Sequence, residues 1–311
     1  MGAMAILSRG DGEKPLTVAA NNLVGRASTC TIRLVDPRVS SAHARITWRR
    51  ERWEIRDLGS RNGTFVNGVR LEHGSSVKLV RGDSLSFGAS DVPYVLTDAS
   101  PPVALARELE SGAILMASDG FLVLPSEDVS AMCVFNQPHD SRWMAEVDGQ
   151  AREVRDGEVV QVVGCAYMLH LPVALAPTMD ASDDGIRVAD LDLHFRVSQD
   201  EERVELFLEQ GGEVQVIPPR AHHYTLLTLA RLRQQAQEDR HVPASARGWV
   251  SVDDLCRMLA TDETKLNVEI YRIRRELSRK GVSDPAAIIE RRRGQRMLRM
   301  GETNVVISRI P

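Results

Sequence analysis

Short polar motifs in the first hundred residues carry side chains that donate hydrogen bonds to anions. Gly25-Arg26 comes first, Ser40-Ser41-Ala42-His43 follows after a loop, and Ser60-Arg61-Asn62-Gly63-Thr64 comes next. Guanidinium, hydroxyl and amide groups suit a phosphate, because a phosphorylated side chain carries roughly two negative charges and three acceptor oxygens. The motifs therefore indicate recognition of a phosphate group, if the fold brings them together.

The elements that must position these motifs are short strands. The stretch lacks helical periodicity, and turn signals such as Gly63, Asn67-Gly68 and Gly82-Asp83 divide it at short intervals. Closely spaced strands of this kind predict an all-β sandwich over residues 5–99. The expected strands include 44–48, 53–57, 64–66, 76–80 and 84–87.

The joint pattern Gly-Arg, Ser-x-x-His, Ser-x-Asn-Gly-Thr and Asn-Gly resembles the forkhead-associated (FHA) family over residues 5–99. The resemblance implies that Arg26 and Ser40 bind the phosphate of a phosphothreonine and that Asn62 holds the peptide backbone beside it. It also implies a preference for phosphothreonine over phosphoserine, because the γ-methyl group fills a small pocket. Ser41 stands where many members have Arg, Lys or Asn, so it adds at most one weaker contact.

Three other residues near these motifs have roles that the resemblance suggests. Arg61 precedes the key asparagine and would reach the phosphate from the facing loop. Arg38 lies where some members read the third residue after the phosphothreonine, so it either favours an acidic residue there or is simply solvated. His43 is expected to tie its loop together by hydrogen bonds and not to bind a metal. The predicted phosphopeptide site is Arg26, Arg38, Ser40, Ser41, Arg61 and Asn62.

The middle of the chain, residues 103–175, also reads as β-rich. A hairpin is expected over 112–124, with its turn at Asp119-Gly120. Residues 152–160 echo residues 77–85, which indicates either a degenerate second FHA-like module or two ordinary hairpins. None of the ligand motifs recurs, so no binding role is assigned. Residues 176–185 contain proline, serine and several aspartates and predict a linker.

Charge is distributed unevenly along the chain. Residues 220–311 carry 18 Lys and Arg against 11 Asp and Glu, whereas the whole chain has a net charge of −4. A basic C-terminal block on an acidic body favours a nucleic-acid partner at that end, although a solvated basic face gives the same count.

Residues 186–302 are predicted to form an α+β domain with three strands, three helices and a final strand pair. That order, together with the run 266–277 (Leu-Asn-Val-Glu-Ile-Tyr-Arg-Ile-Arg-Arg-Glu-Leu), resembles the winged helix-turn-helix domain of the bacterial OmpR/PhoB-type regulators. At about 100° per residue, Leu266, Ile270, Ile273 and Leu277 share one face, which we expect to be the core face. The opposite face would enter the DNA major groove, and the final strand pair would be the wing.

Two departures from the regulator pattern argue for a protein-binding domain instead. Glu269 replaces the usual histidine, and its charge is expected to oppose DNA phosphates, while the loop 260–263 is shorter than usual. His222-His223 is expected to pack and cap the first helix and not to share a metal. The predicted DNA contacts are Thr264, Lys265, Val268, Tyr271, Arg272, Arg275 and Arg279 from the helix and Arg292 and Arg293 from the wing.

Composition bounds the remaining function classes. The chain of 311 residues is 43% hydrophobic and 26% charged, which is typical of a soluble multi-domain protein. No apolar run reaches the roughly 18 residues of a membrane span, and four isolated cysteines indicate reduced thiols in a cytoplasmic protein. No nucleophile–base pair, carboxylate dyad, phosphate-binding loop or metal cluster appears, so we expect a non-enzyme without cofactor or metal.

The leading hypothesis is a transcriptional regulator. A protein phosphorylated on threonine by a Ser/Thr kinase would bind the FHA module, and the winged helix would bind double-stranded DNA. The alternative is a signalling adaptor whose C-terminal domain binds protein instead of DNA.

Overall fold

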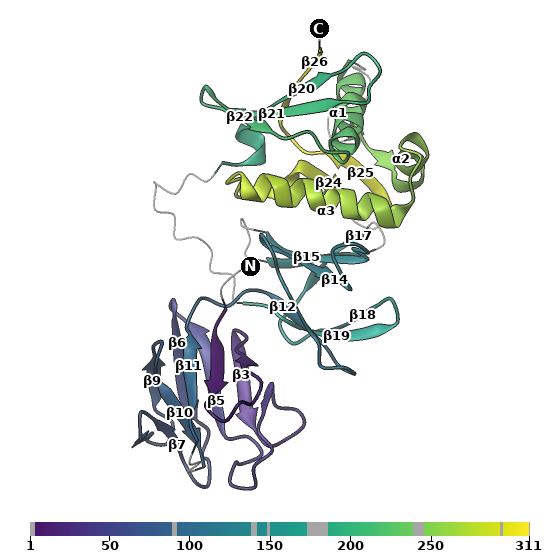
Figure 1. The fold of residues 1–311 in the computed structure, drawn as a ribbon. Coiled ribbons are helices and arrows are strands. Elements are labelled where there is room, and N and C mark those ends of the chain that lie inside the picture. The colour runs from purple at the N-terminus through teal and green to yellow at the C-terminus, as the bar shows by residue number, and fades with distance from the viewer. Residues whose placement is uncertain are drawn as a thin grey trace. The chain divides into compact units, whose positions relative to one another are not determined.

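The computed structural model describes residues 4–88, 92–137, 142–147, 150–172, 186–238, 246–292 and 295–310 (Figure 1). Two compact units emerge from the contacts between residues. One holds Met1–Met116 with Asp156–Val159 and Tyr167–Val173; the other holds Ala117–Arg155, Val160–Ala166 and Ala174–Pro311. The predicted linker 176–185 and the wing residue Arg293 lie outside the described residues.

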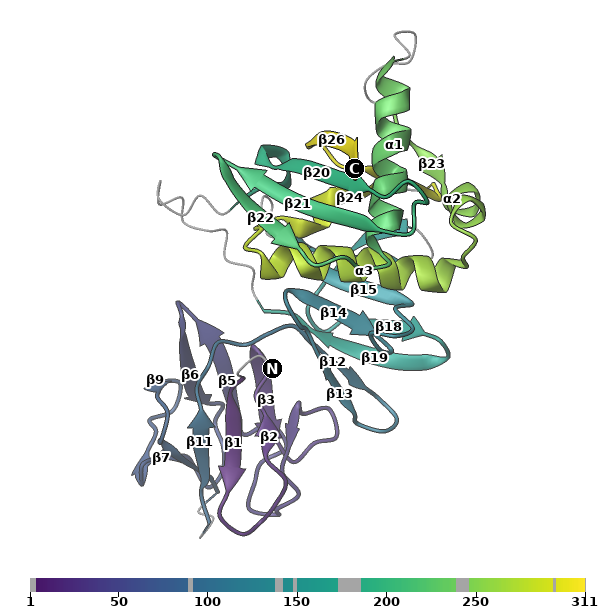
Figure 2. The ribbon, with the colours of Figure 1, turned by 45° about the horizontal axis from the view of Figure 1, so that its top comes forward.

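Two mainly antiparallel β-sheets form the N-terminal part of the first unit (Figures 1 and 2). The first has the order β2-β1-β11-β10-β7-β8 and the second the order β4-β3-β5-β6-β9. The first sheet comprises β1 (Ile6–Arg9), β2 (Leu16–Thr17), β7 (Thr64–Val66), β8 (Val69–Arg70), β10 (Ser84–Phe87) and β11 (Tyr94–Asp98). The second comprises β3 (Asn21–Gly25), β4 (Ile32–Arg33), β5 (Ala44–Arg49), β6 (Arg52–Asp57) and β9 (Ser76–Leu79).

Alternating side chains explain why these strands pair across a common core. In β6, Trp53 and Ile55 are buried while Arg52 and Arg56 are exposed, which is the period of two expected of a strand with one wet face. The core draws on both sheets, with Leu7, Leu85 and Leu96 from one and Ile46, Trp53 and Ile55 from the other. The predicted sandwich is confirmed, and the five expected strands agree with the observed ones to within one residue at each end.

Eight further strands form two four-stranded sheets, with the orders β13-β12-β19-β18 and β14-β15-β16-β17. The predicted turn at Asp119-Gly120 is present, since both residues have positive φ (53° and 86°) and Ser118 bridges Phe121. The predicted hairpin is nevertheless wrong, because the strands on either side of this turn belong to different sheets. The strands are β12 (Leu105–Glu108), β13 (Ile114–Met116), β14 (Phe121–Leu124), β15 (Met132–Gln137), β16 (Arg142–Val147), β17 (Gln150–Val154), β18 (Val159–Val162) and β19 (Cys165–His170).

We call residues 186–310 the C-terminal block. A sheet of order β22-β21-β20-β26 and a second of order β23-β25-β24 flank three helices (Figure 1). The strands are β20 (Asp192–Val197), β21 (Val204–Gln210), β22 (Glu213–Ile217), β23 (Val250–Ser251), β24 (Ile289–Arg291), β25 (Met297–Met300) and β26 (Asn304–Arg309). The helices are α1 (His223–Glu238), α2 (Val252–Met258) and α3 (Glu263–Arg279), with 3-10 turns η1 (Val188–Asp190) and η3 (Pro285–Ile288).

Local capping sets where two of these helices begin. The Ser251 side chain accepts a hydrogen bond from the Asp254 amide at the start of α2, as predicted, and Asp262 accepts one from the Lys265 amide at the start of α3. The expected order of three strands, three helices and a strand pair is observed, followed by β26, which pairs in parallel with β20. Among the described residues, no helix has both the length and the apolarity to cross a membrane.

Candidate functional site

The end of β3 and the loop that follows residue 39 lie in direct backbone contact. The Arg26 amide donates to the Ser40 carbonyl at 3.0 Å, and the Ala27 amide donates to the Ser41 carbonyl at 3.2 Å. A Cβ atom on Gly25 would lie 2.3 Å from the Ser41 oxygen, so only glycine allows this approach. The Gly-Arg motif thus places the Arg26 side chain directly beside Ser40.

Ser40 links this loop to a third one. Its Oγ accepts a hydrogen bond from the Arg61 amide at 3.1 Å, and its own amide donates to His43 Nδ1 at 3.0 Å. The Arg26 Nε donates to the Val39 carbonyl at 3.3 Å, which orients the guanidinium over the same loop. Since the Ser40 oxygen accepts from Arg61, its O–H can be donated to a phosphate oxygen.

His43 is the fully buried tie between the loops. Its Nδ1 accepts from Ser40, so its Nε2 carries the proton and donates to the Gly63 carbonyl at 3.1 Å. Burial lowers the pKa of the imidazole, which keeps it neutral and in this tautomer. The predicted structural role of His43 is confirmed.

Asp57, at the end of β6, organises the 59–64 loop and was missed by the sequence reasoning. Its carboxylate accepts from the amides of Gly59 (2.8 Å) and Ser60 (2.9 Å) and from the hydroxyls of Ser60 (2.5 Å) and Thr64 (2.6 Å). Burial alone would raise the pKa of Asp57, but these four hydrogen bonds outweigh burial and hold the pKa at about 2. An aspartate three residues before a serine is a turn signal that pointed to this role.

Asn62 and Arg38 meet across the two loops. The Asn62 Nδ2 donates to the Arg38 carbonyl at 2.8 Å, so Asn62 is oriented by the loop that also holds Ser40. The Arg38 guanidinium pairs with Asp36 at 2.9 Å and lowers the pKa of that carboxyl. An acidic peptide residue would therefore compete with Asp36 for Arg38.

The six residues predicted for the phosphopeptide site thus gather where three loops meet. Five of them are exposed, and Ser40 is half-buried. Two guanidinium groups, from Arg26 and Arg61, stand on loops joined through Ser40. The arrangement offers cationic and hydroxyl donors to an anion and amide groups to a peptide backbone.

On α3, one predicted face is confirmed and part of the other is wrong. Leu266, Ile270, Ile273 and Leu277 are buried in the core of the C-terminal block, as their spacing predicted. Val268 and Tyr271, predicted to face DNA, are only 4% and 2% exposed. For Tyr271 the reason is a second packing partner, because its ring meets Phe121 of β14 with ring centroids 6.1 Å apart.

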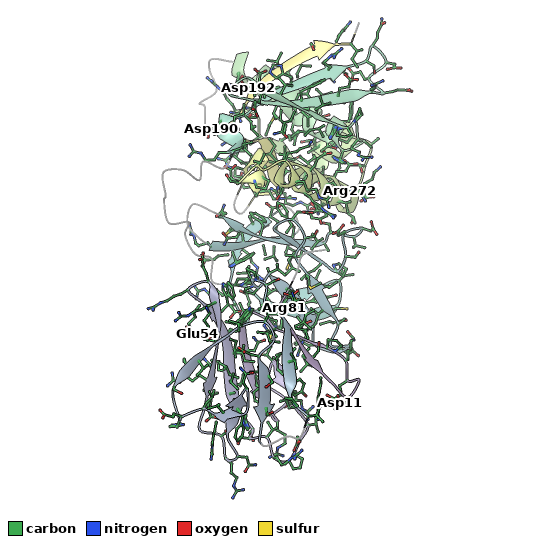
Figure 3. The ribbon with its side chains drawn as sticks, turned by 60° about the vertical axis from the view of Figure 1, so that its left-hand side comes forward. Asp11, Glu54, Arg81, Asp190, Asp192 and Arg272 are labelled. Atoms are coloured by element: carbon green, nitrogen blue, oxygen red, sulfur yellow. The ribbon has the colours of Figure 1, made fainter. Side chains whose placement is uncertain are left out.

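The arginines predicted to contact DNA are paired with carboxylates of residues 117–147. Arg275 Nε donates to Asp119 at 2.7 Å and its Nη1 donates to Glu127, while Arg279 Nε also reaches Asp119, at 3.0 Å. Arg272, which is labelled in Figure 3, remains half exposed and its guanidinium lies 3.6 Å from the Asp128 carboxylate. The sequence placed these arginines on one face but gave no sign of their partners.

Three of the remaining predicted DNA contacts, all within the described residues, are exposed. Thr264 and Lys265 lie in the first turn of α3, at the end of the helix away from Arg279. Arg292, after β24, places its guanidinium 5.7 Å from the centre of the Trp249 ring. These three residues remain accessible to a ligand.

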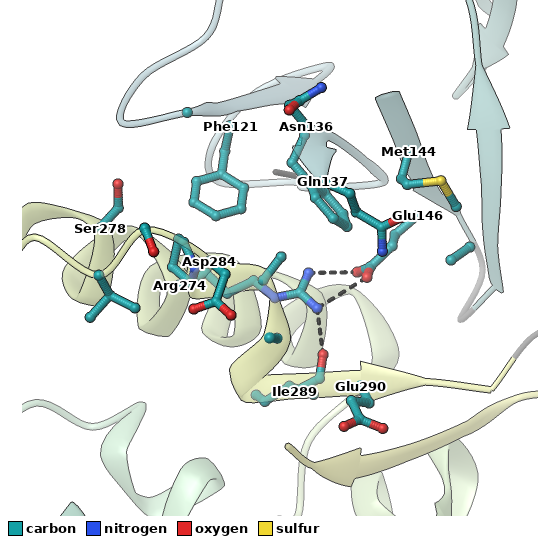
Figure 4. A pocket seen from close by; sticks show the side chains of 18 of the residues that line it. Phe121, Asn136, Gln137, Met144, Glu146, Arg274, Ser278, Asp284, Ile289 and Glu290 are labelled. Atoms are coloured by element: carbon teal, nitrogen blue, oxygen red, sulfur yellow. Dashed lines mark hydrogen bonds and ion pairs between the residues drawn. The ribbon is translucent and has the colours of Figure 1, made fainter. Parts of the chain in front are cut away.

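A buried charge cluster beside α3 was not predicted. The Arg274 guanidinium forms a bidentate ion pair with the Glu146 carboxylate of β16, at 2.7 and 3.0 Å. It also donates a hydrogen bond to the Ile289 carbonyl at 2.6 Å (Figure 4). Arg291 donates to the same carboxylate at 2.8 Å. A cavity of about 670 Å³ adjoins this cluster, lined by the β14–β16 sheet on one side and by α3 and η3 on the other.

His222 and His223, which were expected to pack and cap the first helix, converge on one carboxylate. Their Nε2 atoms lie 3.1 and 2.7 Å from Glu276 Oε2. Both side chains can reach it because α1 begins at His223, so His222 lies outside the helix. His223 Nδ1 accepts from the Arg220 amide, which leaves its proton on Nε2 toward Glu276. The trio is therefore a hydrogen-bonded cluster that joins α1 to α3.

Glu269 contacts the first helix of the block. It accepts a hydrogen bond from the Thr225 hydroxyl of α1 at 2.5 Å, so its carboxylate is directed to the α1 side of α3. That its charge opposes DNA phosphates stays a prediction. The same contact adds a second polar link between α1 and α3.

Replacing Glu276 with glutamine should destabilise the C-terminal block by roughly 2 kcal/mol at pH 7. Burial would raise the pKa of Glu276, but hydrogen bonds from His222 and His223 outweigh it and hold the pKa at about 2. A lowered pKa stabilises the fold above the unfolded value near 4.3, and this contribution is lost as the pH falls toward 2. Hydrogen exchange of α1 and α3 in urea measures the effect. Glu205→Gln, which breaks surface ion pairs with Arg196 and Arg203, is the control and should change stability by less than about 1 kcal/mol. An equal effect of both variants would refute the cluster's role.

Comparisons with known proteins agree with this geometry over one part of the chain. Residues 22–88 match the family model of the FHA domain. Over 129 residues the chain is 31% identical to protein phosphatase 2C 70 of Arabidopsis thaliana, covering 34% of this chain and 20% of the phosphatase. Over 70 residues it is 38% identical to the FHA domain-containing protein FhaB of Mycobacterium tuberculosis, covering 22% of this chain and 44% of FhaB.

A solved structure, Mycobacterium tuberculosis EmbR in complex with a low affinity phosphopeptide, is similar over 32% of this chain and 26% of EmbR, with 28% identity and a TM-score of 0.29. The matches thus span less than half the length of each of these relatives. The family match falls on the sandwich that carries Arg26, Ser40 and Asn62. Residues 22–88 of this chain form an FHA domain.

Proposed function

We propose that this chain is a phosphothreonine-dependent transcriptional regulator. Its FHA domain binds a protein phosphorylated on threonine by a Ser/Thr kinase, and its C-terminal block binds double-stranded DNA. The observation that carries the first half is the meeting of Arg26, Ser40 and Asn62 through the hydrogen bonds of three loops. This cluster presents charge-assisted donors to a phosphate and an amide to the peptide beside it.

The order of the elements and the distribution of charge support the second half of the proposal, DNA binding by the C-terminal block. Three strands, three helices and a strand pair follow one another as in a winged helix-turn-helix domain, with α3 in the place of the recognition helix. Lys265 at the start of α3 and Arg292 beyond β24 are exposed cations at the positions where such a domain meets the DNA backbone. The excess of basic residues in 220–311 acts in the same direction.

A second candidate function is a signalling adaptor whose C-terminal block binds protein. The specific observation in its favour is that Arg272, Arg275 and Arg279 already pair with carboxylates of the same chain. A face that accepts an acidic protein surface within the chain can in principle accept one from a partner. Binding of duplex DNA separates the two candidates.

The double variant Lys265→Ala/Arg292→Ala should weaken binding of the full chain to a fluorescent DNA duplex by about tenfold at 50 mM salt. It should also reduce the slope of log affinity against log salt by about 2, because two phosphate contacts are lost. Fluorescence anisotropy over a salt series measures both. The control Arg187→Ala/Arg203→Ala removes two exposed arginines of the same block and should leave the slope unchanged. Identical affinity and slope for wild type and the Lys265/Arg292 variant would sink the DNA-binding proposal.

A further inference from the structure

The face of α3 that would read DNA is covered by an acidic part of the same chain. We call residues 117–147 the acidic segment; it contains β14, β15 and β16. Both sides of the contact belong to the second compact unit. In the described part of the acidic segment, four carboxylates pair with five arginines of the C-terminal block. The pairs are Asp119 with Arg275 and Arg279, Glu127 with Arg275, Asp128 with Arg272, and Glu146 with Arg274 and Arg291.

Glu146 is the buried centre of this contact. Its side chain is 6% exposed, and those of Arg274 and Arg291 are 1% and 4% exposed. Burial of a lone charge is costly, so each of these groups depends on the other side of the contact to remain buried. The cluster therefore specifies which surface α3 meets.

The rest of the contact is small and imperfectly packed. Among the described residues, its apolar part has six buried members, namely Phe121, Val123, Cys133, Phe135, Met144 and Tyr271. The cavity of about 670 Å³ adjoins the Glu146 cluster, and the buried Arg274 Nε and Arg291 Nη1 lack hydrogen-bond partners. By contrast, every buried residue in the main core of the C-terminal block comes from residues 188–300 of the block itself. Release of the acidic segment would thus leave that core intact.

Pairing with the acidic segment and pairing with DNA use the same groups. A guanidinium that holds a carboxylate in a close ion pair cannot at the same time hold a phosphate with those donors. Arg275 makes two such pairs, and Tyr271 beside it is buried. The carboxylates of the acidic segment occupy places that phosphates would take on α3.

We propose that the acidic segment is an inhibitory cover on α3 that competes with DNA for its arginines. This inference rests on the proposed DNA-binding function, and it assigns the interaction surface and its occupant. The closed structure is the DNA-free form, in which Asp119, Glu127, Asp128 and Glu146 hold the helix. Binding of DNA requires the acidic segment to leave α3.

The test uses the full chain and the double variant Asp119→Asn/Glu127→Gln. These residues lie at the rim, with side chains 26% and 50% exposed, so the change removes both ion pairs of Arg275 and weakens the contact while the buried Glu146 cluster stays paired. The matched control Glu205→Gln/Glu209→Gln makes the same change in net charge on β21, where these carboxylates pair with Arg203 and His194 and not with an arginine of α3. The control accounts for the general gain in DNA affinity that follows from removing negative charge.

Release of the acidic segment from α3 can be measured in the absence of DNA by the reactivity of the Cys133 thiol. This thiol is 7% exposed in the contact, and burial raises its pKa to about 12, so it is inert while the cover is closed. Peptide-level mass spectrometry of maleimide labelling separates Cys133 from the other three cysteines. The rim variant should label Cys133 at least about tenfold faster than wild type, and the control should label it at the wild-type rate.

The second measurement is the affinity for DNA, determined by fluorescence anisotropy with a labelled duplex at 50 mM salt. The rim variant should bind at least about tenfold tighter than the control, which corresponds to ~1.4 kcal/mol. If Cys133 labelling is unchanged and the rim variant and the control bind DNA equally well, the proposal that the acidic segment is an inhibitory cover is wrong. Faster labelling with no DNA binding by any variant confirms the releasable contact and overturns the DNA-binding function on which its inhibitory role rests.

Discussion

Replacing Arg26 with alanine should weaken binding of a phosphothreonine peptide to the full chain at least about 100-fold, a loss of ~2.7 kcal/mol. The guanidinium is exposed at the end of β3 and is aimed over the loop that carries Ser40, where a phosphate would sit. Hydrogen bonds between charged partners are worth about 1.5–3 kcal/mol each, and alanine removes the charge as well as the donors. Isothermal titration calorimetry measures the change.

The control for this prediction is Arg52→Ala. Arg52 is an exposed arginine at the opposite end of the β5–β6 hairpin, where it pairs with Glu54, so its loss changes the net charge equally. The affinity of the Arg52→Ala variant for the phosphopeptide should stay within about twofold of the wild-type affinity. If Arg26→Ala binds as tightly as Arg52→Ala, Arg26 is not the phosphate ligand.

Asp57→Asn should destabilise the FHA domain by roughly 3 kcal/mol at pH 7, although Asp57 is not expected to touch the ligand. Asp57 accepts the Ser60 and Thr64 hydroxyls on Oδ2 and the Gly59 and Ser60 amides on Oδ1, so asparagine, which has one acceptor oxygen, leaves one of these two pairs of donors without its acceptor. The pKa of Asp57 is about 2 in the folded chain, below the unfolded value near 3.9. The stabilisation is therefore present above about pH 4 and is lost as the pH falls toward 2.

Hydrogen exchange of β5 and β6 in urea, at pH 7 and pH 3, measures this prediction locally. Asp98→Asn is the control, because Asp98 accepts from the Ser100 amide and hydroxyl at the end of a strand, in a less buried position. Its effect should not exceed about 1 kcal/mol. An Asp57→Asn variant as stable as the Asp98→Asn control would contradict the account of the loop.

The FHA domain was largely predictable from the sequence because its information is local. Turn residues fixed the strand ends, and each ligand motif lies within a few residues of a turn. Asp57 was missed because it ends an ordinary alternating strand, and its role depends on hydroxyls that fold back onto it from residues 60 and 64.

Helix α3 shows where periodicity stops being informative. A period of 3.6 residues identified the face of Leu266 and Ile270, because that face packs within the C-terminal block. It did not reveal that Val268 and Tyr271 are buried as well, and the ring that covers Tyr271, Phe121, comes from a distant part of the chain. Periodicity reports that a face is apolar or polar, but not whether a polar face meets solvent, DNA or carboxylates.

Glu146 is the clearest case of a residue beyond sequence reasoning. It sits in a strand among apolar neighbours and meets Arg274, 128 residues further along the chain. No spacing rule connects two positions so far apart. Only the fold brings the carboxylate and the two guanidiniums together.

Recognition of phosphothreonine is the central claim, and one calorimetric comparison tests it most directly. The full chain is titrated with a peptide mixture of fixed central residue and degenerate flanks, synthesised with phosphothreonine, with phosphoserine and with unmodified threonine. We predict saturable binding of the phosphothreonine mixture, weaker binding of the phosphoserine mixture and none of the unmodified one. Equal binding of the phosphothreonine and unmodified mixtures would contradict the claim.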